Sequence, residues 1–202
     1  MNWLQELKPI VGQWADRNFP ANINSSIIRS ITGQIEEVGE LAHCILKREQ
    51  NIRKAASNPK ELIDDMKDAI GDITVYMLNT SYYLNLVAPD PEQLPTLYLN
   101  EVALAQNIFK LSEDESKSIY IILLLNACVA GYLINAKVPR SSVEIDQDFR
   151  DRAYSAMSGI VAFLSILCLR EGFNYREIVE FTVNKVTKRN WIDHPTNADV
   201  MA

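Results

Sequence analysis

Apolar residues recur at helical spacing through most of this chain, whereas the alternation typical of half-buried strands is scarce. The clearest stretch is predicted to begin at Asn24 or Ser25, both competent N-caps, and to continue past Lys47. Its core stripe consists of Ile28, Ile31, Ile35, Val38, Ala42 and Ile45. Of the 202 residues, 48% are apolar, seven are glycine and eight are proline, which suits a helical protein with a substantial core. The pattern therefore predicts an all-α, multi-helix bundle.

Further helices are predicted on both sides of this stretch. One covers about residues 2–17, although Pro9 makes its first part uncertain, and another runs from Asn58-Pro59 to about Leu86. The segment 88–95 has three prolines within seven positions, which we interpret as a linker. The remaining predicted elements are helices at about 97–111, 115–136, 147–171 and 174–189 and a tail at 192–202.

We expect residues 1–202 to form a single domain with two halves, 1–88 and 96–191, the second of which ends in a closing helix. The second half resembles a degenerate copy of the first, because Ser155–Phe163 repeats the size and apolar pattern of Asp68–Tyr76 without its two aspartates. One such match is weak evidence, since any two amphipathic helices align somewhere. A true duplication would give a metal-binding first half and a structural second half.

Charge and composition argue against several classes of protein. The formal charge of −6 disfavours a nucleic-acid groove built on positive potential. Cys44, Cys128 and Cys168 are widely spaced in apolar helical segments, as in core residues of a reducing compartment. The N-terminus lacks the pattern of a secretory signal, and the longest apolar run, Tyr120–Ile134, is shorter than the roughly 20 residues of a membrane span. We expect a cytoplasmic protein without nucleic-acid or membrane partners.

Two carboxylate clusters interrupt the apolar pattern of consecutive predicted helices. Glu36, Glu37 and Glu40 lie within four positions of one another. Asp68 and Asp72 are also four positions apart, so that each cluster projects from one helix face. Carboxylates this close repel one another unless protons or cations neutralise them. Because the clusters themselves consist of hard oxygen ligands, they predict a divalent-cation site that favours Mg²⁺, or Mn²⁺, over zinc.

The alternative for either cluster is a solvated helix face. Glu40 and Asp72 argue against it, because each lies in a segment with almost no other charge, where an unpaired carboxylate is costly. No lysine or arginine stands at a helical spacing that would pair both acids, so a metal ion is the simplest partner. The adjacent Gly39 and Gly71 each cost roughly 1 kcal/mol relative to alanine and suggest close helix approach or ligand access. A purely structural protein is the remaining alternative if Glu40 and Asp72 are exposed and far apart.

Three motifs together resemble a known family. They are Trp14-Ala15-Asp16-Arg17-Asn18, Glu36-Glu37-Val38-Gly39-Glu40-Leu41 and Lys67-Asp68-Ala69-Ile70-Gly71-Asp72. They resemble the MazG-like, all-α nucleoside triphosphate pyrophosphohydrolases, which include the dimeric dUTPases. The resemblance covers about residues 10–80. Residues 172–191 resemble the family's closing helix, and 90–150 match only in helical character.

The resemblance implies an enzyme and its assembly. Members of this family cleave a nucleoside triphosphate between its α and β phosphates in a Mg²⁺-dependent reaction, which yields a nucleoside monophosphate and pyrophosphate. The fold implied is a helical bundle assembled from several subunits, so we expect a homodimer or higher homo-oligomer. The resemblance identifies neither the base nor the sugar of the substrate.

The family signature is Glu-x-x-Glu on one helix and Glu-x-x-Asp on the next. Ala69 stands where the second motif has its glutamate, and Asp68, one residue earlier, resembles a variant of the family that replaces this ligand. The metal ligands implied are Glu37, Glu40, Asp68 and Asp72. The bound ions would lower the pKa of a water molecule, and either Glu36 or Glu37 would accept its proton. Spacing alone does not choose between these two glutamates.

Six further residues are candidates for substrate binding, namely Trp14, Arg17, Asn79, Lys185, Lys188 and Arg189. The three basic residues at 185–189 share a helix face and suit the distal phosphates, but compensation of the helix dipole explains them equally well. Trp14 suits stacking on a base, although an aromatic residue at helical spacing more often belongs to the core. Asn79 suits a contact to sugar or base; the alternative is a polar residue on a helix with no role in binding.

Two other classes of protein fit parts of the pattern. A catalytically inactive relative would bind a nucleotide or another protein through the same bundle, and Ala69 is the residue that favours it. A carboxylate-bridged di-iron bundle normally carries Glu-x-x-His on two of its helices; Glu40 and His43 have this spacing, but the second acidic cluster has no histidine. His43 and His194 are too far apart for a histidine metal site. The sequence therefore predicts a hydrolase, with the inactive relative as the alternative.

Overall fold

The computed structural model describes residues 2–52, 57–93 and 147–194, and the regular elements in these ranges are all helices. The helices are α1 (Trp3–Asn18), α2 (Ile23–Gln50), α4 (Pro59–Tyr83), α7 (Gln147–Glu171) and α8 (Tyr175–Val186). The all-α prediction is thereby confirmed for the described ranges. The helices predicted at 97–111 and 115–136, Cys128, the end of the linker and most of the tail lie outside the described residues.

Asparagine side chains cap four of these helices and set their first residues. The capping residues, each of which accepts a hydrogen bond from the backbone N–H three positions later, are Asn2, Asn22, Asn58 and Asn174. α4 begins at Asn58-Pro59 as predicted. The start predicted for α2 was wrong, because the Ser25 N–H donates to Asn22 Oδ1 at 2.9 Å and so lies inside the first turn.

The end of α4 also differs from the prediction by three residues. Asn85 has a φ of 51° and turns the chain out of the helix after Leu84. The Leu86 N–H then bonds to the Ser81 carbonyl at 2.9 Å, and the Asn85 N–H bonds to the Tyr82 carbonyl at 3.0 Å. This pair of bonds is the Schellman arrangement, in which a left-handed asparagine ends a helix.

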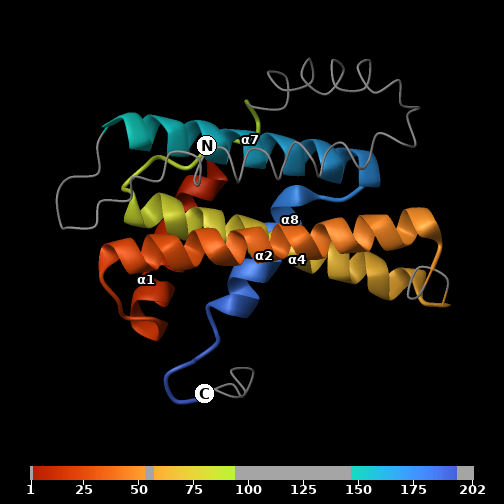
Figure 1. Ribbon diagram of the computed structural model, residues 1–202, viewed down its shortest axis with the longest axis horizontal. Helices are drawn as coiled ribbons and strands as arrows, with labels where there is room; N and C mark the ends of the chain where they lie inside the picture. The colour runs from red at the N-terminus through yellow and green to blue at the C-terminus, as the bar shows by residue number, and fades with distance from the viewer. Residues whose placement is uncertain (1, 53–56, 94–146, 195–202) are drawn as a thin grey trace.

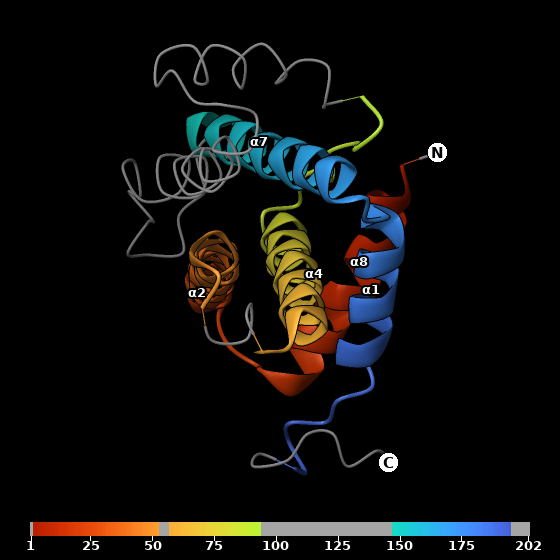
Figure 2. The same ribbon diagram turned by 90° about the vertical axis from the view of Figure 1, so that its right-hand side faces the viewer.

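α4 lies at the centre of the described helices, with α2 on one side and α1 and α8 on the other (Figures 1 and 2). α2 and α4 run in opposite directions along most of their lengths (Figure 1). α7 packs across both α4 and α8. The central position of α4 explains its apolar positions, of which the fully buried ones include Met66, Ile70, Ile73, Met77 and Leu78.

The predicted core stripe of α2 is correct in its middle and shifted at its start. Ile31, Val38 and Ile45 are buried as predicted. Ile28 is 50% exposed, whereas its neighbour Ile27 is 2% exposed and takes the core position. Adjacent residues on a helix point about 100° apart, so only one of the two isoleucines can face α4.

α7 contains one segment, Phe149–Glu171, that is long and apolar enough to cross a membrane by length and composition alone; no other described segment passes this test. Of the window concerned, 72% is buried inside the protein, which is the burial of a core helix. The end of α7 is joined to α2, because the Arg48 guanidinium donates to both carboxylate oxygens of Glu171 at 2.6 and 2.9 Å.

Gly71 allows α8 to approach α4 closely. A β-carbon at this position would collide with the side chain of Thr182, whereas a β-carbon at Gly39 would meet nothing within 4 Å. Of the two glycines beside the acidic residues, Gly71 therefore permits close helix approach and Gly39 leaves open space.

We expect Gly71→Ala to destabilise the protein by about 1–3 kcal/mol, because the added methyl group forces Thr182 or the whole of α8 away from α4. The matched change Gly39→Ala is expected to be neutral or stabilising by up to about 1 kcal/mol, since alanine has the higher helix propensity. Urea denaturation of the two variants measures the difference. Equal unfolding free energies would contradict the close approach at Gly71.

Candidate functional site

Two rows of residues with the same spacing meet between α2 and α4. The row on α2 advances in steps of four, three and four and consists of Ser26, Ser30, Gly33 and Glu37. The row on α4 has the same steps and consists of Asp72, Tyr76, Asn79 and Tyr83. This spacing places each row on one helix face. Because the helices are antiparallel, the first residue of one row meets the last residue of the other.

The two rows form four levels, each made of one residue from α2 and the residue of α4 that faces it, and the two residues of each level interact. At the middle levels, Asn79 Nδ2 donates to Ser30 Oγ at 3.0 Å, and a β-carbon on Gly33 would collide with the ring of Tyr76. Gly33 thus makes room for an aromatic ring that a larger residue would displace. At the outer levels, Ser26 lies close enough to the Tyr83 hydroxyl to act on its pKa, and the carboxylates of Glu37 and Asp72 repel each other.

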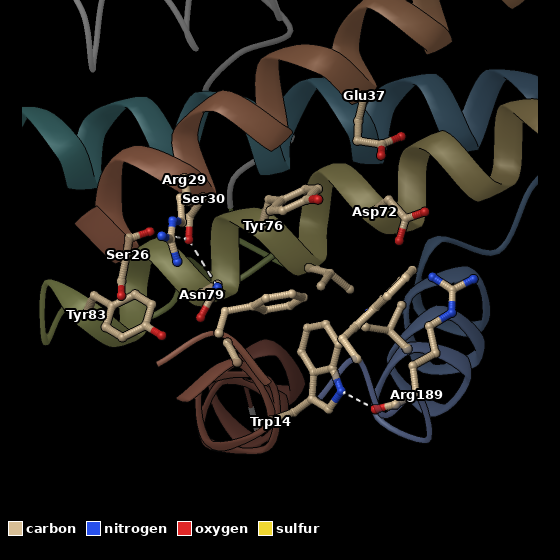
Figure 3. Close-up of a pocket in the computed structure, with 15 residues that line it drawn as sticks. Trp14, Ser26, Arg29, Ser30, Glu37, Asp72, Tyr76, Asn79, Tyr83 and Arg189 are labelled. Atoms are coloured by element: carbon tan, nitrogen blue, oxygen red, sulfur yellow. Dashed lines mark hydrogen bonds between the residues drawn. The ribbon is translucent and has the colours of Figure 1, made fainter. Parts of the chain in front are cut away.

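A pocket of about 300 Å³ lies along the two rows, and α1 and the segment after α8 enclose its other side (Figure 3). Its lining residues are Trp14, Ala15, Phe19, Ser26, Arg29, Ser30, Glu37, Asp72, Val75, Tyr76, Asn79, Tyr83, Val186, Arg189 and Trp191. Five of these were predicted from the sequence as site residues, namely Trp14, Glu37, Asp72, Asn79 and Arg189.

Glu37 and Asp72 form the acidic end of the pocket (Figure 3). Burial, followed by the charge of Asp72 and of the other nearby carboxylates, raises the pKa of Glu37 to about 8. Burial and the charge of Asp68 raise the pKa of Asp72 to about 6, although Lys185 and Arg189 oppose this shift. At neutral pH the pair therefore retains a proton or requires a cation to neutralise it.

The other three predicted acids, Glu36, Glu40 and Asp68, are exposed and line an adjoining open recess. In the part of the chain that the structure describes, no three His, Cys, Asp or Glu side chains form a group that could hold a metal ion. Glu37 and Asp72 nevertheless have the chemistry of Mg²⁺ ligands, since they are partly buried carboxylates with an excess of negative charge. Glu40 acts on both of them electrostatically and is one of the nearest further carboxylates.

Lys185 on α8 and Arg189 in the segment after it act on the acidic residues, a pairing that spacing along the sequence did not reveal. Lys185 Nζ donates to Asp68 Oδ1 at 2.8 Å, and Lys185 and Arg189 both lower the pKa of Asp72. The inference that no lysine or arginine pairs both Glu40 and Asp72 considered only helical spacing along the sequence, so it did not include these two cations. Lys185 binds a carboxylate in this structure rather than lining the pocket. Lys188 is exposed and does not line the pocket either.

Trp14 is both a core residue and a wall of the pocket. It is 7% exposed, and its ring makes an edge contact with Phe19 at 5.6 Å between centroids. Its Nε1–H donates to the Arg189 carbonyl at 3.0 Å, while the Trp191 N–H donates to Asn18 Oδ1 at 2.8 Å. The end of α1 thus holds the segment that carries Arg189. Arg17, also predicted as a substrate contact, is exposed and outside the pocket lining.

Sequence reasoning missed several lining residues, among them Ser26, Arg29, Ser30, Tyr76, Tyr83 and Trp191. The two serines could have been found from their spacing. Ser30 lies four positions after Ser26 and seven positions before Glu37, so the three residues share a helix face that is otherwise apolar. Tyr76 and Tyr83 carried the same signal relative to Asp72. Arg29 and Trp191 had no such signal, since the tertiary fold alone brings them to the pocket.

Neither a protein-family model, nor a curated protein, nor a solved structure matches this chain.

Proposed function

We propose that this protein is a metal-dependent nucleoside triphosphate pyrophosphohydrolase, which converts an NTP or dNTP to the monophosphate and pyrophosphate. The observation that carries the proposal is the pairing of Glu37 and Asp72 at one end of a pocket whose other end is aromatic and amide-lined. Acidic residues with an adjacent arginine suit a metal-bound polyphosphate, and the aromatic end suits a base. The volume of about 300 Å³ lies at the lower end of the range for small-molecule sites.

The proposed cofactor is Mg²⁺, with Mn²⁺ as the substitute. Glu37 and Asp72 would hold it, with Glu40 and Asp68 at the adjoining recess. The ion supplies an activated water molecule and neutralises phosphate charge when it is bound. In its absence, the acidic pair repels a triphosphate, so binding of the substrate should itself depend on the metal.

The chain's own residues have separate tasks in this proposal. Glu37 is favoured over Glu36 as proton acceptor, because Glu37 lines the pocket and Glu36 lines the adjoining recess. The water oxygen bonds to the α phosphorus as the bond from that phosphorus to the oxygen bridging to the β phosphate breaks. One proton of the water goes to Glu37, and Arg189 neutralises the leaving pyrophosphate. Trp14 positions Arg189 through its backbone carbonyl.

A nucleotide-binding protein without catalysis is the second candidate. Ala69 is 1% exposed and offers no oxygen at the position of the family's second glutamate, and Lys185 pairs with Asp68, its proposed replacement. Both observations reduce the number of carboxylates free for a metal ion. This candidate predicts metal-dependent nucleotide binding without release of pyrophosphate.

Measurement of pyrophosphate release from ribo- and deoxyribonucleoside triphosphates, with Mg²⁺, Mn²⁺ or EDTA, tests the proposal. We expect turnover of at least one nucleotide with metal and none with EDTA. Tight binding without turnover would favour the second candidate, and the absence of both binding and turnover would overturn both. The proposed homodimer is tested separately by light scattering of the full chain.

A further inference from the structure

The side-chain amide of Asn79 has a fixed orientation at the far end of the pocket. Its Nδ2 atom donates to Ser30 Oγ at 3.0 Å, and the Ser30 hydroxyl donates to the Ser26 carbonyl at 2.9 Å. A serine hydroxyl has one proton, so Ser30 can only accept from Asn79 once it has donated to Ser26. The amide nitrogen of Asn79, and not its oxygen, therefore faces Ser30.

This orientation leaves Asn79 Oδ1 as an acceptor without a donor. The atom is buried and has no hydrogen-bond partner in the ranges that the structure describes. In Figure 3 the amide nitrogen is turned toward Ser30 and the oxygen lies on the opposite side. Buried carbonyl oxygens in proteins normally have a partner, because an unpaired one costs free energy. Asn79 lines the pocket, so a small movement of its side chain would present this acceptor to a ligand N–H group.

We infer that Ser30 is a positioning residue that makes the pocket distinguish nucleobases by the N–H group they present to Asn79. The inference rests on the proposed function, since it requires the base to occupy this end of the pocket. Without Ser30, the amide could turn and present Nδ2 instead, so that acceptor and donor groups on a base would be received equally well.

Amino and oxo bases provide the natural comparison. Cytosine has an amino group where uracil has an oxygen, and at the adjacent ring nitrogen the donor and acceptor roles are reversed. Adenine and hypoxanthine differ in the same way. Whichever of these positions meets Asn79 Oδ1, one base of each pair presents a donor and the other an acceptor. We expect the wild-type protein to prefer one base of a pair by about tenfold, the factor typical of a single matched hydrogen bond.

Binding affinities test this without requiring turnover. The probes are the α,β-methylene analogues of CTP, UTP, ATP and ITP with Mg²⁺, titrated into the full chain by calorimetry. Ser30→Ala should bring the affinity ratio of each pair to about one. Ser158→Ala is the matched control, because Ser158 is a buried serine that donates to the Tyr154 carbonyl at 2.8 Å on α7, away from the pocket. It should keep the wild-type ratio.

The ratio of the affinities for the two bases of a pair shows whether Ser30 positions Asn79 or only supports the fold. General damage to the fold lowers both affinities and leaves their ratio unchanged. If Ser30→Ala does not fold, Ser30→Cys, with its weak donor, should lower the ratio in a folded protein. An unchanged ratio in the folded variant, equal affinities in the wild type, or no binding of any analogue would overturn the inference. Base discrimination that depends on Ser30, without pyrophosphate release, would instead overturn only the proposed catalysis.

Discussion

Glu37→Gln and Asp72→Asn are each expected to lower kcat for pyrophosphate release by at least about 100-fold. Either change removes one negative charge from the acidic end of the pocket while preserving the shape of the side chain. The loss of a metal-binding carboxylate and of the proposed proton acceptor both act on the chemical step, where contributions of this size are usual. Initial rates at saturating nucleotide and Mg²⁺ measure the effect.

In the absence of metal, Glu37→Gln and Asp72→Asn should each be at least as stable as the wild type, because each removes repulsion between partly buried carboxylates. Circular dichroism therefore separates lost chemistry from lost structure. Asp151→Asn provides the control, since Asp151 is an exposed acid on α7 and does not line the pocket. Activity within a factor of two of the wild type in both Glu37→Gln and Asp72→Asn would exclude this acidic pair as the centre of the reaction.

In the absence of divalent metal, the free energy of unfolding is expected to fall as the pH rises from about 4 to about 8. The pKa values of Glu37 and Asp72 in the folded protein are about 8 and about 6, above their ordinary values of 4.5 and 3.8. The folded state therefore binds more protons than the unfolded state over this interval, and rising pH favours unfolding. Asp72 acts in the lower part of the interval and Glu37 extends it to pH 8. Solvent screening limits the combined effect to the order of 1–2 kcal/mol.

Urea denaturation at several pH values, with EDTA or with Mg²⁺, measures this dependence. Glu37→Gln should flatten the pH dependence above about pH 6, because it removes the group with the higher pKa. Mg²⁺ should restore stability most strongly near pH 8, since the cation binds the deprotonated carboxylates of the folded state. The same slope in the wild type and in Glu37→Gln would show that Glu37 ionises normally in the folded protein.

The parts of the fold that local chemistry determines were predictable from the sequence. Asn58-Pro59 marked the start of α4, because a capping side chain and a preset proline act within a single turn. The start of α2 was mistaken, since Asn22, Asn24 and Ser25 are all competent caps and only the path of the preceding chain selects Asn22. Ile28 was assigned to the core for a related reason. Ile27 and Ile28 are both apolar, so at the end of the stripe the sequence does not show which of them faces α4.

The candidate site was predictable where it depends on one helix at a time. Asp72 stood out because it is a charge within an apolar segment, and the structure brings it to one pocket with Glu37. Glu40 was singled out for the same reason but is exposed, because spacing along one helix does not show which neighbour covers it. The pairing of Lys185 with Asp68 could not be predicted, since the two residues are 117 positions apart and meet only through the packing of α8 on α4. The matching of Ser30 with Asn79 likewise depends on the relative register of two antiparallel helices, which spacing along one helix does not determine.

The contact between Trp14 and the Arg189 carbonyl has a consequence for the synthesis of this protein. These two residues are 175 positions apart, and together they join the end of α1 to the segment after α8 at the wall of the pocket. A nascent chain can form the antiparallel pair of α2 and α4 early, because those helices are neighbours in sequence. The enclosed pocket can form only after Arg189 has emerged from the ribosome. Until then the wall that Trp14 and the Arg189 segment form is missing, and the pocket stays open on that side.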